Sequence, residues 1–136
     1  MKYFYITLII FLYTFNVYGH ATLIITGIEH EKGMLDVKIY NDKKSFLNEE
    51  LAIESVRKKP TKNKTIVPLT KIHEGKIAIV IYHDENNDGK LNTGLFWRPK
   101  EGYAFSNKYI PKGPPRFKKA IIELIHGKPV TIKLNY

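Results

Sequence analysis

The segment His83–Gly94 has the residue types and the spacing of a calcium-binding loop. Its pattern, D-x-N-x-D-G, places carboxylate and amide oxygens two residues apart, where they can converge on one hard cation. The glycine that ends the pattern permits the sharp turn that brings the next backbone carbonyl to the ion. The predicted ligands are Asp84, Asn86, Asp88, the carbonyl of Lys90 and Asn92. A site of this composition is expected to bind calcium weakly, with a Kd of about 10⁻⁴–10⁻³ M.

Two features of that motif are missing from the chain. Leu95 stands where the motif has a bidentate glutamate, and no helical periodicity flanks the loop. A carboxylate from Glu85 or Glu101, or additional water, would have to complete the ligand set. The alternative is that Asp, Asn and Gly only close a turn, because these residues favour the backbone conformations of turns. Both interpretations stay open at the level of sequence.

A second group of candidate binding residues lies in the basic stretch Trp97–Lys119. This stretch carries seven Lys and Arg residues and one acidic residue, within a chain of 136 residues whose formal net charge is +9. Aromatic side chains lie between the basic ones. The predicted binding residues are Trp97, Arg98, Lys100, Tyr103, Lys108, Lys112, Arg116, Lys118 and Lys119.

A concentration of positive charge attracts acidic partners. Acidic glycan, lipid headgroups and an acidic envelope protein are the predicted classes of partner. Nucleic acid is not expected, because the chain carries the signature of export described below. The alternative is a solvated basic face that binds nothing.

The sequence offers no arrangement of residues that indicates catalysis, and we expect no enzyme. The chain has no cysteine, which excludes disulfides, thiolate metal sites and a cysteine nucleophile. Its five histidines are scattered, without the paired spacing of a zinc site. His83 adjoins Asp84, but neighbouring residues of a strand point to opposite faces. A hydrogen-bonded histidine at the end of a strand is therefore the expected role of His83.

The first 19 residues have the composition of a secretory signal peptide. Lys2 precedes an apolar run from Tyr3 to Tyr13, and small or neutral residues follow it. Cleavage after Gly19, with Ala21 as the alternative, is expected to leave one domain over residues 20–136. No later apolar run approaches the roughly 20 residues that cross a bilayer. The mature protein is therefore expected in the periplasm or outside the cell.

Alternation of apolar and polar residues predicts a succession of short strands. The expected strands are Ala21–Ile28, Gly33–Tyr40, Leu51–Arg57, Thr65–Thr70, Lys76–His83, Lys119–Ile125 and Pro129–Asn135. Lys76–His83 is apolar on both faces, which indicates a central strand. Pro68 places its own strand at an edge, because proline cannot donate to a ladder.

The last two segments, Lys119–Ile125 and Pro129–Asn135, are expected to pair with each other, with a short helical turn as the alternative for the first. The predicted fold is all-β, a single antiparallel β-sandwich of about seven strands, similar to immunoglobulin or transthyretin domains.

Several short motifs are more specific than this pattern. They are His83–Asn86 with Asp88–Leu91, Pro99–Tyr103, Phe105–Asn107, and Gly113–Pro115 with Phe117. With these motifs the chain resembles, from Thr22 to Leu134, the bacterial domain of unknown function 2141 (DUF2141). The resemblance implies a small exported β-sandwich and no particular activity. Asn92 departs from the aspartate usual in the family, and Lys118-Lys119 from its tendency towards acidic residues.

Overall fold

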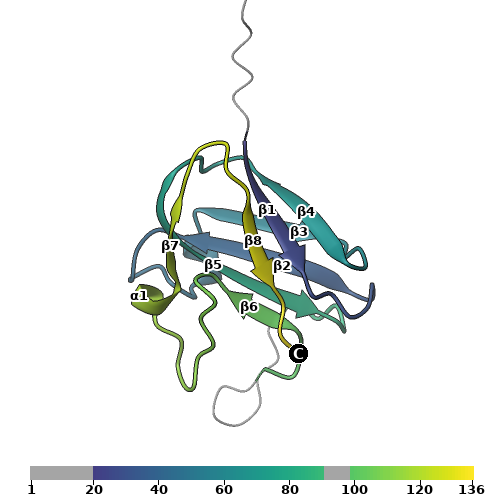
Figure 1. Cartoon of the computed structure of the whole chain (residues 1–136). Helices are drawn as coiled ribbons and strands as arrows, with labels where there is room; N and C mark the ends of the chain where they lie inside the picture. Colours follow the sequence, from purple (N-terminus) through teal and green to yellow (C-terminus); the bar gives the residue numbers. More distant parts are fainter. Residues whose placement is uncertain (1–19, 91–98) are drawn as a thin grey trace, which may run out of the picture.

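The computed structural model describes residues 20–90 and 99–136, which form eight strands in two sheets (Figure 1). One sheet has the order β4 (Lys64–Leu69), β1 (Ala21–Thr26), β8 (Val130–Lys133). The other has the order β3 (Glu54–Lys58), β2 (Met34–Tyr40), β5 (Gly75–Asp84), β6 (Tyr103–Phe105), and β7 (Ile121–Leu124) also pairs with β5. Two short helical segments are η1 (Glu49–Leu51) and α1 (Phe117–Ala120). The architecture is an all-β sandwich, as the sequence predicts.

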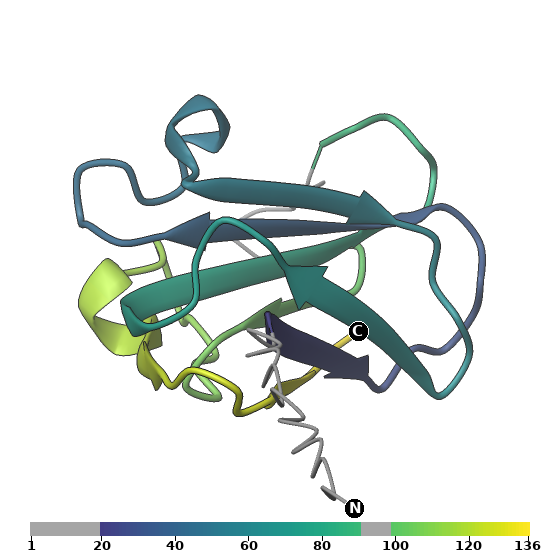
Figure 2. The same cartoon turned by 90° about the horizontal axis from the view of Figure 1, so that it is seen from above.

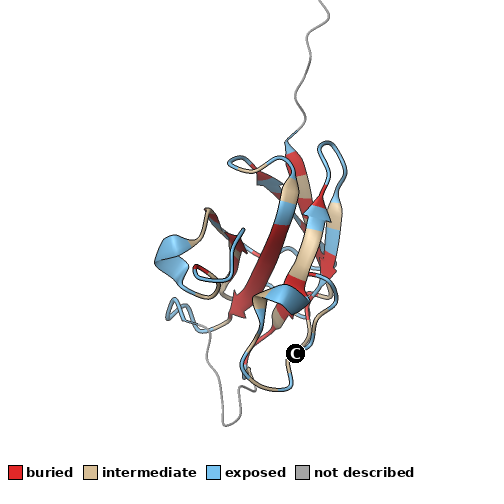
Figure 3. Cartoon of the chain, turned by 90° about the vertical axis from the view of Figure 1, so that its left-hand side faces the viewer, coloured by how far each residue is buried: buried red, intermediate tan, exposed pale blue. Residues whose placement is uncertain are grey.

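Strand β5 is the centre of the larger sheet, which confirms the prediction from its apolar faces. It pairs with β2 along one edge and with β7 and then β6 along the other. Residues 77–84 are buried on both faces, and β5 is the most continuously buried strand in Figure 3. Its isoleucines, Ile77, Ile79 and Ile81, face the smaller sheet and belong to the main core.

The outer face of the larger sheet is covered by loops rather than by a third layer. Tyr40, Val80 and Phe105 form a second apolar cluster there. Phe46 and Phe117 close over it with their ring centroids 5.6 Å apart in an edge-to-face arrangement. The chain between β6 and β7 is therefore anchored to the sheet that it crosses.

Strand β4, which contains Pro68, lies at the edge of the smaller sheet, as predicted. The chain reaches η1 before β3, so the strand expected at Leu51–Arg57 begins later, at Glu54. Within residues 20–90 and 99–136, no helix is long and apolar enough to cross a membrane.

The expected pairing of the last two strands is wrong. A single turn of α1 precedes β7, β7 pairs with β5, and β8 crosses to the smaller sheet and runs parallel to β1 (Figures 1 and 2). The sandwich is consequently not purely antiparallel. A short turn between two strands does not decide whether they share a sheet, because both strands bury their apolar residues in the same core either way. The eighth strand is β6, which lies between the strands expected at Lys76–His83 and Lys119–Ile125.

Candidate functional site

The predicted calcium loop begins where β5 ends, at His83 and Asp84. Both residues are fully buried. His83 contacts the β1–β2 connection and the C-terminus, whereas Asp84 contacts β3. The two side chains point to opposite faces of the sheet, as neighbours in a strand must, and they belong to separate networks.

Asp84 is held by an arginine and by the backbone of its own loop. Its Oδ2 accepts hydrogen bonds from Arg57 Nη2 at 2.7 Å and from the Gly89 amide at 2.9 Å. Its Oδ1 accepts one from the Asp88 amide at 3.0 Å. Arg57 Nη1 also donates to Asp36 Oδ2 at 2.6 Å. One guanidinium therefore bridges two buried carboxylates through short, charge-assisted hydrogen bonds.

The electrostatics of this network depend on Arg57. Burial raises the pKa of Asp36, and the nearby Arg57 guanidinium opposes that rise without cancelling it. The hydrogen bond to Asp84 raises the pKa of Arg57. Sequence reasoning missed Arg57, because it reaches the loop only through the pairing of β3, β2 and β5.

The other predicted calcium ligands bond to one another. Asn86 Oδ1 accepts from the Asp88 amide at 3.0 Å, and Asn86 Nδ2 donates to Asp88 Oδ2 at 3.2 Å. Asp88 Oδ1 accepts from the Lys90 amide at 2.8 Å. These are the contacts of a turn closed by its own side chains. Asn92 lies outside the described residues.

The two carboxylates considered for completing the ligand set tie the loop to the start of β6. Glu101 Oε1 accepts from the Glu85 amide at 3.1 Å, and Glu85 Oε1 accepts from the Gly102 amide at 3.2 Å. Glu85 Oε2 lies 3.0 Å from His30 Nε2. Glu85 thus contacts the β1–β2 connection as well as the segment before β6.

On the inner face, the imidazole of His83 lies between a carbonyl and a hydroxyl. Its Nε2 is 2.5 Å from the Lys32 carbonyl oxygen, and its Nδ1 is 2.7 Å from the Tyr136 hydroxyl. Because a carbonyl only accepts, Nε2 carries the proton and Nδ1 accepts from Tyr136. Burial raises the pKa of Tyr136, which keeps this hydroxyl protonated. A Cβ on Gly102 would stand 2.4 Å from the Tyr136 ring, so this glycine makes room for the tyrosine.

The predicted basic binding residues are mostly exposed. Trp97 and Arg98 lie outside the described residues. Tyr103 is half-buried and packs against Phe105, with ring centroids 6.2 Å apart. The exposed ones are Lys100, Lys108, Lys112, Arg116, Lys118 and Lys119. Of these six basic residues and Tyr103, Lys108 is the one that lines the groove described in the next paragraph.

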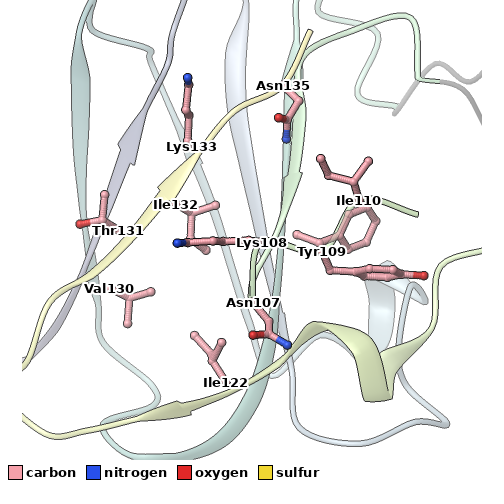
Figure 4. Close-up of a pocket in the computed structure, with 11 residues that line it drawn as sticks. Asn107, Lys108, Tyr109, Ile110, Ile122, Val130, Thr131, Ile132, Lys133 and Asn135 are labelled. Atoms are coloured by element: carbon pink, nitrogen blue, oxygen red, sulfur yellow. The ribbon is translucent and has the colours of Figure 1, made fainter. Parts of the chain in front are cut away.

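A groove of about 810 Å³ lies between β8 of the smaller sheet and β6 and β7 of the larger one (Figure 4). Its lining residues are Phe105, Asn107, Lys108, Tyr109, Ile110, Ile122, Val130, Thr131, Ile132, Lys133 and Asn135. It exists because β7 and β8 separate into different sheets. Just beyond β8, Tyr103 and Asn135 exchange two backbone hydrogen bonds of 2.8 Å and rejoin the sheets.

The side chains of this groove come from three separate segments. Figure 4 shows Lys108 reaching across the lining towards β8, with Tyr109 and Ile110 on the other side. Sequence reasoning identified Lys108 but not the apolar residues, since Val130 and Ile132 match any inward-facing strand. Ile110 of this segment is 58% exposed, which is visible only in the structure.

Fold and site together define a small all-β sandwich with a groove at the opening between its sheets. A family model described as "Uncharacterized protein conserved in bacteria (DUF2141)" matches residues 24–133, and the chain belongs to this family. Searches of curated proteins and of solved structures return no match.

The motif Phe105–Asn107 holds the groove segment in place. The Ser106 hydroxyl accepts from the Ile79 amide at 2.8 Å and donates to the Ala120 carbonyl. Asn107 Nδ2 donates to the Lys119 carbonyl at 3.0 Å. This motif therefore fastens both ends of the chain that carries Lys108.

Proposed function

We propose that this protein is an exported, non-enzymatic binding module that holds an acidic lipid of the cell envelope, of the fatty-acid type, in the groove beside β8. The observation that carries the proposal is the position of Lys108, whose side chain crosses the apolar part of the lining. The polar residues of the lining besides Lys108 are Asn107, Thr131, Lys133 and Asn135. An apolar cleft with a few convergent polar groups is the usual form of a small-molecule site. The hydrocarbon part would lie against Ile122, Val130 and Ile132.

The dimensions and the charge of the groove favour this ligand among the predicted acidic partners. A volume of about 810 Å³ lies within the range of about 300–1,000 Å³ typical of such sites. An acidic glycan would leave the isoleucines of the lining without an apolar contact. The exposed basic residues of the chain around Lys108 would draw an anionic ligand towards the groove.

Export is part of the proposal. Strand β1 begins at Ala21, so cleavage after Gly19 would leave all eight described strands intact. The signal-like composition of residues 1–19 supports a protein that works in the periplasm or outside the cell.

Palmitate is the probe that tests the groove. We expect wild-type protein to bind palmitate more tightly than the uncharged alcohol of equal chain length, measured by displacement of a fluorescent fatty acid. Lys108→Gln should weaken palmitate binding by at least about tenfold, since a hydrogen bond to a charged group contributes about 1.5–3 kcal/mol, and should leave the alcohol unaffected. Lys62→Gln is the matched control, because Lys62 is also exposed but lies between β3 and β4.

A second pair of substitutions tests the apolar part of the groove. Ile110→Ser should weaken both lipids, whereas Ile66→Ser, at a similarly exposed isoleucine of β4, should weaken neither. Equal palmitate affinity in wild type and Lys108→Gln would contradict the assigned position of the acidic group. If neither lipid binds, the result favours the alternative function. The protein would then be a structural or accessory envelope domain without a ligand, in which the Asp84 loop is only a turn.

Calcium binding by the Asp84–Asn92 loop stays a prediction, and Arg57 is the group with which calcium would compete. The guanidinium already occupies Asp84 Oδ2, and a bound ion would have to replace it. In Arg57→Gln the two buried carboxylates, Asp36 and Asp84, lose their cation. We therefore expect millimolar calcium to raise the Tm of Arg57→Gln more than that of wild type.

Thermal unfolding in EDTA and then in calcium measures this difference, and magnesium serves as the control ion. Adding Asp84→Asn to Arg57→Gln should abolish the calcium effect. The calcium prediction fails if neither protein shifts at about 10 mM, which lies above the weak end of extracellular calcium modules. An equal shift in both proteins would place the ion elsewhere.

A further inference from the structure

We propose that His30, His83 and Glu85 form a binding site for a divalent transition-metal ion, with Zn²⁺ as the representative ion. The site lies where the β1–β2 connection meets the end of β5, on the face of the sheet opposite Asp84. It shares no residue with the groove and does not depend on the proposed lipid function. His83 and Glu85 flank Asp84 in the sequence, but they point to the face opposite that predicted calcium ligand.

The three side chains already bring their ligand atoms together. One nitrogen from each imidazole and one oxygen of Glu85 all lie within 4.8 Å of one another. His30 Nε2 and Glu85 Oε2 are 3.0 Å apart, and the two imidazole centroids are 4.8 Å apart. Ligands at the bond lengths of a tetrahedral zinc site, about 2.0–2.1 Å, stand roughly 3.3 Å from each other. The cluster therefore needs only a small contraction around an ion.

The hydrogen bonding of His83 prepares it as a ligand. Its Nε2–H donates to the Lys32 carbonyl, which fixes the ring and leaves the Nδ1 lone pair on the side of Tyr136. A ligating histidine that donates its other N–H to a backbone carbonyl is the common arrangement in metal sites. Here Tyr136 would turn aside from Nδ1 or remain close to the bound ion. Tyr136 is 46% exposed, so its ring has open solvent into which it can turn.

His30 supplies the independent observation. Its Nδ1 is buried and has no hydrogen-bond partner within residues 20–90 and 99–136. Buried polar atoms in folded proteins are almost always paired, so the unpaired Nδ1 marks His30 as a side chain whose hydrogen bonding is incomplete. The side chains of His30 and Glu85 keep 34% and 29% of their surface exposed, so an ion can reach the site from solvent.

The donor set selects the class of metal. Two imidazole nitrogens and one carboxylate suit Zn²⁺, Cu²⁺ or Ni²⁺ far better than Ca²⁺ or Mg²⁺, which prefer oxygen. Zn²⁺ commonly takes three such protein ligands and completes its coordination with water. The negative charge of Glu85 would offset part of the charge of the ion.

The remaining histidines, His20, His73 and His126, make a necessary control. Their rings lie near one another at the other end of the sandwich, with centroid separations of 5.5 Å for His20–His73 and 6.2 Å for His73–His126. All three are exposed. Exposed histidines can bind metal weakly, and a test must separate them from the proposed site.

Calorimetric titration with ZnCl₂, with the absorbance of bound Co²⁺ as a second readout, tests the proposal. We expect one tight ion per chain in wild type and in the double variant His73→Ala/His126→Ala. His30→Ala should weaken that ion at least about a hundredfold, and Glu85→Gln should weaken it by at least about tenfold. Both positions are partly exposed, so the variants are expected to fold, which circular dichroism would verify.

Two results would overturn the proposal. One is tight binding that survives His30→Ala but is lost in His73→Ala/His126→Ala, which would assign the ion to the exposed histidines. The other is the absence of any tight ion in wild type. Palmitate affinity is measured separately, so failure of the metal site and failure of the lipid site are distinguishable.

Discussion

Gly33→Ala is expected to destabilise the protein by about 3–5 kcal/mol, the largest loss that we predict for a single methyl group. Gly33 has a φ of +68°, which an L-residue adopts only with strain. A Cβ there would also stand 2.0 Å from the Asp84 carbonyl oxygen and 2.8 Å from Glu85 Cα. These are backbone atoms at the end of the central strand, so the end of β5 itself would have to move.

Chemical denaturation of Gly33→Ala and Gly127→Ala measures the contribution of this contact. Gly127 has a φ of +72°, but among the described residues no heavy atom beyond its own chain neighbours lies within 4 Å of a Cβ placed there. We expect Gly127→Ala to cost only the backbone strain, about 1–2 kcal/mol. Equal losses in the two variants would contradict the close packing of the β1–β2 connection against Asp84. The same displacement would separate Glu85 from His30, so Gly33→Ala should also weaken Zn²⁺ binding.

Ser106→Ala is expected to destabilise the protein by about 2–4 kcal/mol. The substitution leaves the Ile79 amide without its acceptor and the Ala120 carbonyl without its donor, and each unpaired buried group costs about 1–3 kcal/mol. Ser106 is 1% exposed, so bulk water does not replace the hydroxyl. Because Ser106 fastens the segment that carries Lys108, palmitate affinity should fall as well.

Ser55→Ala is the matched control for Ser106→Ala. The Ser55 hydroxyl accepts from Lys38 Nζ at 2.7 Å on an exposed part of β3, where water can take its place. We expect a change of less than about 0.5 kcal/mol at this position. Comparable losses in Ser55→Ala and Ser106→Ala would show that the hydroxyl of Ser106 does not hold α1 to the sheet.

The strands of this fold were predictable wherever one residue pattern decided the outcome. The central position of β5 could be predicted because its apolar side chains alternate between both faces of the strand. Only a strand covered on both sides can bury all of them. The edge position of β4 could be predicted because Pro68 has no N–H to donate to a neighbouring strand. The resemblance to DUF2141 was likewise available from short motifs and is confirmed by the family match.

The pairing of β8 was not predictable from such local patterns. The inward-facing residues Val130 and Ile132 suit a strand beside β7 as well as one beside β1, because the same core covers both positions. The groove follows from that choice, since it opens only when β7 and β8 separate. Most of its lining is therefore a consequence of topology, and Phe105 and Asn107 are the lining residues that belong to a sequence motif.

At the end of β5 the local reasoning succeeded and the long-range reasoning did not. The alternation of side chains correctly placed His83 and Asp84 on opposite faces. Their partners come from distant positions: Arg57 from β3, His30 from the β1–β2 connection, and Tyr136 from the C-terminus. Periodicity carries no information about such contacts, so Arg57 and His30 emerged only from the structure.

The lipid groove is the central claim, and amide chemical-shift mapping during a palmitate titration tests it most directly. We predict changes concentrated at Asn107–Ile110, at Ile122 and at Val130–Lys133, with little change elsewhere. Changes centred on the basic turn Lys58–Lys64, or the absence of any change at saturating palmitate, would contradict it.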